Sequence, residues 1–254
     1  EGGSDTADLV ITVDPVNDAP VASGTIADQS DDDAGVVAGV ATSSFFSDID
    51  GDVLGYSASG LPAGLSIDPV TGVISGTIDN SASQGGPASD GVYSVTVTAD
   101  DGNGGTVDQT FTWTVANPAP VANDDAASTD EDVAVSGNVI GSGGAGDVAD
   151  SDADGDVLSV TTFVVAGDPA TYNAGDTATI AGVGTVLLAS DGSYTFTPDA
   201  DWNGTVPAIT YTLSDGEGGS DTADLVITVD PVNDNPVAND DAASTDEDVA
   251  VSGN

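Results

Sequence analysis

The sequence predicts an all-β chain of tandem β-sandwich domains. Its 254 residues are rich in Gly and Val and poor in aromatic residues, at 5%, and we find no convincing amphipathic helical pattern. Identical segments recur about one domain length apart, which indicates a repeat architecture. Short alternating segments separated by Gly, Asp and Ser occur about seven times per 100–120 residues, as in a two-sheet sandwich.

The repeats predict how the chain is divided. Residues 1–18 recur identically at 217–234, and residues 120–138 recur identically at 236–254. The predicted parts are the last strand of a preceding repeat at 1–18, unit A at 19–117, unit B at 118–235, and the first strand of a following repeat at 236–254. The chain lacks Met, so we expect it to be a section of a longer array.

Alternation and turn residues predict the strands of each unit in order. In unit A they are 53–59, 65–67, 73–78, 91–99 and 106–115. In unit B they are 133–139, 157–165, 177–180, 184–188, 193–197, 209–213 and 222–229. This number of short strands is typical of an Ig-like sandwich.

The aromatic residues are expected to pack in or around the cores. They are Tyr56, Tyr93, Trp113, Trp202 and Tyr211. Trp202 precedes an Asn203-Gly204 turn, so stacking on a sugar ring is an alternative role for it.

The charge of the chain predicts a cationic partner. No Lys, Arg or His balances 44 acidic residues, and the formal charge is −44. Self-repulsion of this size destabilises a compact state, so the carboxylates need water, hydrogen bonds or external cations. Only four acids are Glu, at Glu1, Glu131, Glu217 and Glu247. The short Asp side chain suits tight metal-binding turns, so this bias favours Ca²⁺ over a salt adaptation, although both can apply.

The same composition excludes several classes of function. Without basic residues the chain has no phosphate clamp, so we expect no nucleic-acid partner. Without Cys it forms no disulfide or thiolate metal site, and without Lys it forms no Lys–Asn cross-link. Without His, Cys or Lys no Ser or Thr has a conventional base, so we expect no enzyme. No run approaches the roughly 18 apolar residues of a membrane span, so we expect no membrane insertion.

Two acidic loops are the strongest candidate Ca²⁺ sites. Ca²⁺ takes about 6–8 oxygen ligands, and alternate Asp residues in a loop can direct carboxylates to one centre. The candidate ligands are Asp150, Asp152, Asp154 and Asp156 in unit B, and Asp48, Asp50 and Asp52 in unit A. Gly155 permits a sharp bend. The alternative is a solvated acidic turn.

The segments between units form a second candidate motif. They supply the candidate ligands Asp14, Asn17 and Asp18, and again Asp230, Asn233 and Asp234. Side-chain and backbone oxygens next to Pro can bind a cation between two domains, and the alternative is an ordinary polar linker. The linker between units A and B, residues 115–120, contains no Asp. We therefore expect fewer ligands and weaker binding there, or a joint that flexes.

These junctions resemble the Asp-x-Asn-Asp-Asn linker of cadherins. Asp152-Ala153-Asp154 resembles the Asp-x-Asp ligands of the domain after such a linker. Asp101 and Asp215, each before a Gly, resemble the cadherin Asp that precedes the last strand, and Glu131 resembles the acidic ligand near the first strand. The resemblance implies that these residues bind Ca²⁺.

A closer resemblance is to the bacterial cadherin-like repeats of giant RTX-type adhesins. Residues 46–56, 61–65 and 71–76 of unit A look like the dystroglycan-type cadherin-like domain. Residues 192–198, 202–204 and 211–216 of unit B look like the tandem cadherin-like repeat. The resemblance covers nearly the whole chain and implies tandem Ig-like/cadherin-like sandwiches joined by Ca²⁺-binding linkers.

The expected function is therefore structural. The chain is expected to be an extender segment of a secreted bacterial surface adhesin or extracellular fibre, stiffened by Ca²⁺ at the acidic loops and junctions. Expected partners are Ca²⁺, neighbouring repeats of the same chain, and possible identical chains or cell-surface glycans. A Ca²⁺-dependent carbohydrate-binding module and a homophilic adhesion module are the alternatives. The expected location is extracellular, at the bacterial surface.

Overall fold

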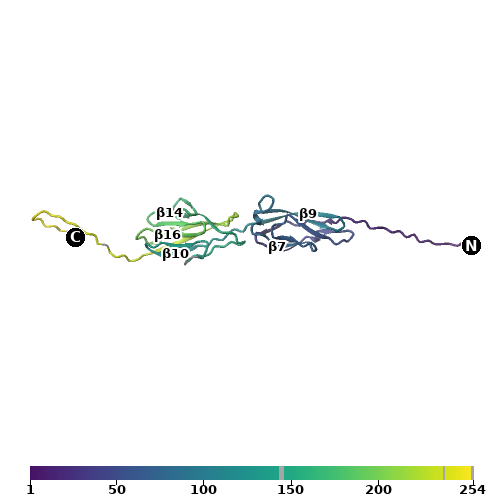
Figure 1. The fold of residues 1–254 in the computed structure, drawn as a ribbon, viewed down its shortest axis with the longest axis horizontal. Coiled ribbons are helices and arrows are strands. Elements are labelled where there is room, and N and C mark those ends of the chain that lie inside the picture. Colours follow the sequence, from purple (N-terminus) through teal and green to yellow (C-terminus); the bar gives the residue numbers. More distant parts are fainter. Residues whose placement is uncertain (143–145, 237, 253–254) are drawn as a thin grey trace.

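The structure, a computed structural model, describes residues 1–142, 146–236 and 238–252. Figure 1 shows two β-sandwiches arranged end to end along the long axis of the molecule, with an extended segment at each terminus. Each sandwich has its own cluster of buried apolar residues. The chain is therefore all-β with two separate cores, as the sequence predicts.

Unit A is a sandwich of two antiparallel-rich sheets. One sheet has the order β2-β9-β8-β5 and the other β3-β7-β6, while β1 pairs with β4. The strands are β1 (Val21–Ala22), β2 (Gln29–Asp32), β3 (Val36–Ala41), β4 (Phe46–Ser47), β5 (Gly55–Ser59), β6 (Leu65–Ile67), β7 (Val73–Thr77), β8 (Val92–Asp100) and β9 (Thr106–Ala116). Two 3₁₀ turns, η1 (Ser43–Phe45) and η2 (Ala82–Gln84), lie in the connections.

Unit B repeats this architecture. One sheet has the order β10-β19-β18-β12-β13 with β17 beside β19, and the other β11-β16-β15-β14. The strands are β10 (Asp125–Asp130), β11 (Val135–Asn138), β12 (Ser159–Val165), β13 (Thr171–Asn173), β14 (Thr177–Ile180), β15 (Gly184–Leu188), β16 (Ser193–Pro198), β17 (Gly204–Thr205), β18 (Ile209–Ser214) and β19 (Ser220–Asp230).

The cores form where inward-facing strand positions meet. In β8, alternate residues Tyr93, Val95, Val97 and Ala99 are buried, because successive side chains of a strand point to opposite faces. Trp113 and Tyr211 are fully buried, and Tyr93 is buried too. Tyr56 and Trp202 are partly buried and pack against the cores of their units.

One strand of each unit pairs in parallel with the last strand of that unit. Asp32 of β2 lies opposite Ala116 of β9, and Asp130 of β10 lies opposite Asp230 of β19. The next residue in each unit is acidic and buried, Asp33 in unit A and Glu131 in unit B. This pairing therefore places an acidic side chain at the C-terminal end of each unit, where the chain leaves the sandwich.

The strand predictions are confirmed where alternation was strong. The segments 65–67, 177–180 and 184–188 match β6, β14 and β15 at both ends. The prediction missed the polar strands β2 and β10, whose sequences QSDD and DAASTD carry no apolar alternation, and it also missed the apolar strand β3, VVAGVA. The partner strand, not the local pattern, decides their conformation.

The terminal segments differ from the predicted strands. Residues 1–18 and 238–252 form no strand in this structure, although the identical copy of residues 1–18 at 217–234 includes β19. A strand needs a hydrogen-bonded neighbour, and neither segment has one in the described part of the chain. Residues 237, 253 and 254 of the predicted following strand lie outside the described residues. The assignment of both segments to neighbouring repeats stays a prediction.

Within the described residues, no helix has the length and apolar character needed to cross a membrane.

Candidate metal centre

Three carboxylates of the acidic loop lie close together at the N-terminal end of unit B. Asp152, Asp154 and Asp156 each place one oxygen within 4.8 Å of the others. Oδ1 of Asp152 accepts the backbone N–H groups of Asp154, Gly155 and Asp156 at 3.1, 3.2 and 3.4 Å. Gly155 has a φ of +88°, a left-handed conformation that favours glycine. The turn therefore closes on Asp152 and leaves the other carboxylate oxygens free.

Those free oxygens have no protein donor. Oδ2 of Asp152, both carboxylate oxygens of Asp154 and Oδ2 of Asp156 are buried and accept no hydrogen bond. Burial and the nearby charges of Asp152 and Asp156 raise the pKa of Asp154 to about 7. Burial also acts to raise the pKa of Asp152, but its hydrogen bonds outweigh this and lower it. A shared cation removes the same repulsion without protonation.

The linker and the last turn of unit B add ligands to this cluster. The side-chain amide of Asn117 donates to Oδ2 of Asp215 at 2.8 Å, and Oδ1 of Asn117 is buried without a donor. Oδ1 of Asp215 accepts the N–H groups of Glu217 and Gly219 at 2.8 and 3.0 Å. Oε2 of Glu217 is also buried without a donor. The A–B junction thus holds six of the eight such oxygens found in the described residues.

Unit A contributes to the same junction. Gln84 of η2 donates its side-chain N–H to the backbone oxygen of Glu217 at 2.8 Å. The carboxylate of Asp33, which accepts the N–H of Ser83 at 2.9 Å, lies near enough to raise the pKa of Asp156 and of Glu217, after the larger effect of burial on both. Two units and their linker therefore converge on one acidic centre.

The N-terminal end of unit A has the same construction. Asp48, Asp50 and Asp52 place one oxygen each within 4.8 Å of one another. Oδ1 of Asp48 accepts the N–H of Asp50 and of Gly51 at 2.8 and 3.1 Å, and Oδ2 is buried without a donor. Gly51 has a φ of +80°, as Gly155 has in the other loop.

The preceding linker closes over this loop. Asn17 donates its side-chain amide to Oδ2 of Asp101 at 2.9 Å, and the backbone N–H of Asp18 donates to Oδ2 of Asp50 at 2.7 Å. Asn103 donates its amide to Oδ2 of Asp52 at 2.9 Å. Asn103 lies two residues after Asp101, as Glu217 lies two residues after Asp215. The A–B centre therefore has a carboxylate where the preceding centre has an amide, and it is the more acidic of the two.

The exit of unit B carries a third acidic group. Asp132, Asp201 and Asp234 have oxygens within 4.8 Å of one another and are exposed. Beside them, the buried Glu131 accepts the side-chain amide of Asn203 at 2.9 Å and the backbone N–H of Val232. Asn203 therefore positions the carboxylate of Glu131 at the C-terminal end of unit B.

Several predicted ligands lie outside these groups. Asp14 and Asp230 belong to none of the acidic groups in the described residues, and Asn233 donates its side-chain amide to the backbone oxygen of Asp234 at 3.3 Å. Asp150 does not join Asp152, Asp154 and Asp156 as predicted, because its carboxylate turns inward to the N–H of Asn123. Asp33, Asn117 and Glu217 were not predicted from the sequence. Asn117 could have been found, because it lies three residues before a Pro, as Asn17 does.

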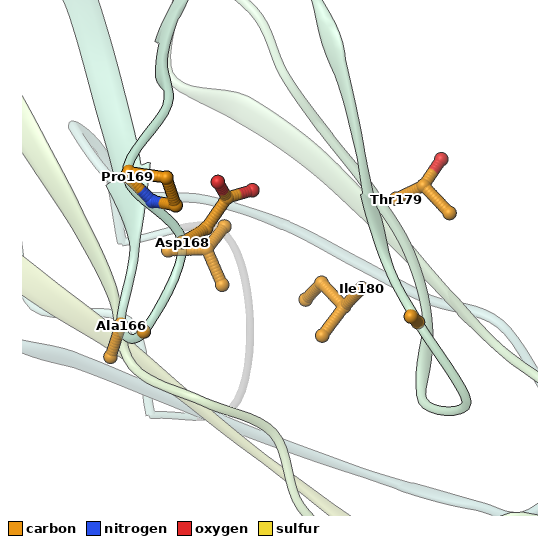
Figure 2. Close-up of a pocket in the computed structure, with 8 residues that line it drawn as sticks. Ala166, Asp168, Pro169, Thr179 and Ile180 are labelled. Atoms are coloured by element: carbon orange, nitrogen blue, oxygen red, sulfur yellow. The ribbon is translucent and has the colours of Figure 1, made fainter.

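A separate hollow of about 340 Å³ lies on unit B beside β12 and β14. Figure 2 shows Asp168 and Ile180 on its lining. The Asp168 carboxylate accepts the N–H of Ala170 at 2.9 Å and the hydroxyl of Tyr172 at 2.7 Å, and these bonds lower its pKa. This single, hydrogen-bonded acid does not form the carboxylate pair that glycoside hydrolysis uses.

Family models match both units. Residues 117–231 match the model described as "Bacterial cadherin-like domain", and residues 19–116 match the one described as "Putative Ig domain". Both are families of non-enzymatic domains. No curated protein matches the chain.

The solved structures that match the chain include cadherin ectodomains. Drosophila N-cadherin EC1-4 is 18% identical over 85% of this chain and 50% of its own, with a TM-score of 0.37. Human Protocadherin-24 EC1-2 is 19% identical over 86% of this chain and 100% of its own, with a TM-score of 0.34. An endo-fucoidan hydrolase from glycoside hydrolase family 107 is 19% identical over 85% of this chain, with a TM-score of 0.36, and the chain spans 29% of its length.

Proposed function

Because the chain joins an Ig-like domain to a bacterial cadherin-like domain, we propose that it is a structural extender segment stiffened by Ca²⁺ at its junctions. The parent protein is a secreted bacterial surface adhesin or extracellular fibre of the RTX type. The segment acts as a spacer that holds a terminal binding region away from the cell, or it forms the body of a filament.

The observation that carries this proposal is the A–B junction. Its buried oxygens come from the linker residue Asn117 and from Asp154 and Glu217 of unit B, and none of them has a protein donor. No side chain in the sequence carries a positive charge. A buried carboxylate without a partner is costly, so a cation from solution is the available compensation.

The donor set fits Ca²⁺. All candidate ligands are carboxylate or amide oxygens, which hard cations prefer, and Ca²⁺ accepts the irregular arrangements that Mg²⁺ does not. The residues proposed to hold it at this junction are Asp152, Asp154, Asp156, Asn117, Asp215 and Glu217. Those proposed for the preceding junction are Asp48, Asp50, Asp52, Asn17 and Asp101. The remaining candidate ligands are proposed to act in a full array; they are Asp14, Asp18, Glu131, Asp230, Asn233 and Asp234.

Binding at such a junction restricts bending. An ion held by the linker and the loop of unit B fixes the direction in which the linker enters that unit. Affinities of about 10⁻⁴–10⁻³ M are expected, as for other extracellular modules. Binding of Ca²⁺ to the folded state then stabilises the chain by mass action.

The test is thermal unfolding in three solutions: chelator, millimolar Ca²⁺, and NaCl at matched ionic strength. The proposal predicts a rise in Tm that is specific to Ca²⁺. An equal rise with NaCl means that the charges are only screened, and the proposed Ca²⁺ function is then wrong.

A further inference from the structure

Unit B buries an acidic group in its interior, apart from the loop cluster. Asp125, the first residue of β10, is 2% exposed. Its Oδ1 accepts the N–H of Val148 at 2.7 Å, whereas its Oδ2 is buried and accepts no hydrogen bond. A carboxylate oxygen in this state has neither water nor a protein donor to offset its charge.

The neighbouring Tyr211 hydroxyl has a single proton to offer to several acceptors. Tyr211 is fully buried. Its oxygen lies 3.0 Å from the backbone oxygen of Asn123 and 3.3 Å from that of Val139. It lies 3.2 and 3.1 Å from the two carboxylate oxygens of Asp150. One hydroxyl has one proton, so Tyr211 cannot satisfy all of these acceptors.

Further negative charge surrounds the group. The carboxylate of Asp147 accepts the N–H of Asn138 at 3.1 Å and the hydroxyl of Tyr194 at 3.4 Å. Burial raises the pKa of Asp125 to about 6, supported by the charges of Asp147 and Asp150 and opposed by hydrogen bonds from Val148 and Tyr211. The interior of unit B therefore concentrates anionic oxygen beside Tyr211.

Unit A shows that the sandwich does not require this polar group. Asp150 lies two residues before Asp152 in unit B, and the matching residue before Asp48 in unit A is Phe46. Tyr211 lies four residues before Asp215 in unit B, and the matching residue before Asp101 in unit A is Val97. Phe46 and Val97 are both buried apolar core residues. Unit B thus has polar side chains at two positions where unit A has apolar residues packed in its core.

We propose that this group is an internal Ca²⁺ site of unit B, formed by Oδ2 of Asp125, the carboxylate of Asp150 and the backbone oxygens of Asn123 and Val139. The ligands are hard oxygens, and two carboxylates match a divalent cation. A set of carbonyl and carboxylate oxygens around the buried Asp125 suits Ca²⁺ better than Mg²⁺, which keeps several of its waters. The ion joins the start of β10, the residue after β11 and the acidic loop, so it stabilises unit B itself and not the junction.

The test counts Ca²⁺ bound by the full chain and by two variants at saturating Ca²⁺. Asp125→Asn keeps the size of the side chain and removes its charge. Asp199→Asn is the matched control, because Asp199 is an exposed acid of the same unit. Asp125→Asn is expected to bind one Ca²⁺ fewer than the unchanged chain, and Asp199→Asn the same number. An unchanged count in Asp125→Asn overturns the proposal.

A second measurement needs no variant. Long-wavelength anomalous diffraction from crystals of the unchanged chain grown with Ca²⁺ is expected to show a peak between Asp125 and Asp150. Absence of that peak, with peaks present at the junction, overturns the internal site and leaves the proposed function standing. If Asp125→Asn raises Tm in chelator and the peak is absent, the group holds a proton and the proposal is wrong.

Discussion

The side-chain amide of Asn117 donates a hydrogen bond to Oδ2 of Asp215 at 2.8 Å, across 98 residues of sequence. The linker is thereby fastened to the turn before the last strand of unit B. Asn17 makes the same bond to Asp101 at 2.9 Å in the preceding junction. In each case the amide nitrogen positions the linker, and at Asn117 the amide oxygen stays buried and available to a cation.

Asn117→Ala is expected to weaken Ca²⁺ binding at the A–B junction. The change removes one proposed ligand and a hydrogen bond to a charged group, which contributes about 1.5–3 kcal/mol. Affinity for this ion is therefore expected to fall about 10- to 100-fold. Calorimetric titration measures it, with the exposed Asn80→Ala as the control. Equal affinities in the two variants contradict the assigned role of Asn117.

Asp154→Asn is expected to have opposite effects in the two conditions. In chelator it removes a buried charge without a donor, worth on the order of 1–3 kcal/mol, so Tm is expected to rise. In Ca²⁺ it removes a ligand, so the Ca²⁺-specific rise in Tm is expected to shrink. Asp152 is a poorer choice, because its Oδ1 also holds the turn through Asp154 and Gly155. A loss of Tm in chelator means that Asp154 stabilises the metal-free loop, against this account.

Stability in chelator is expected to increase as the pH falls from about 8 to about 5. The pKa of Asp154 is raised to about 7 and that of Asp125 to about 6, whereas an unfolded Asp titrates near 3.9. Between these values the folded chain binds more protons than the unfolded chain, so acid favours folding until about pH 4. Asp101, whose pKa its hydrogen bonds from Asn17 and Asn103 lower, loses its contribution only at still lower pH.

Urea unfolding at several pH values measures this dependence. Protons compete with Ca²⁺ for the same carboxylates, so in Ca²⁺ the trend is expected to reverse. A metal-free chain that loses stability steadily from pH 8 to pH 5 contradicts the assigned burial of these acids.

Trp113→Ala is expected to unfold unit A without unfolding unit B. Trp113 is fully buried, and loss of such a side chain costs about 3–5 kcal/mol. The units have separate cores, so Trp202 in unit B is expected to report an unchanged transition in chelator. Fluorescence of Trp202 with parallel calorimetry separates the two transitions. A matching shift in the Trp202 transition shows instead that the units unfold together.

The sequence predicted the parts of the site that lie close together in the chain. Asp48, Asp50 and Asp52 form one group, as do their counterparts in unit B, because alternate residues of a short loop converge without help from the rest of the fold. The fold class followed from alternation in segments such as 92–99, where the apolar residues face the core.

The remaining parts depend on tertiary contacts that a local pattern does not encode. Asp33 ends a run of three acids, and only the parallel pairing of β2 with β9 places it at the junction. Glu217 lies in a Gly-rich turn whose backbone accepts a hydrogen bond from Gln84 of unit A. Asp150 follows the alternation of the loop, but the inward path of the chain directs it to Tyr211.

The most direct test of the central claim is small-angle X-ray scattering from the full chain in chelator, in millimolar Ca²⁺, and in NaCl at matched ionic strength. The account predicts one extended, stiff particle in Ca²⁺ and a flexible pair of domains in the other two solutions, with Asp154→Asn less stiffened than the unchanged chain. The same stiffness in chelator as in Ca²⁺ contradicts the claim that Ca²⁺ at the junction sets the direction of the array.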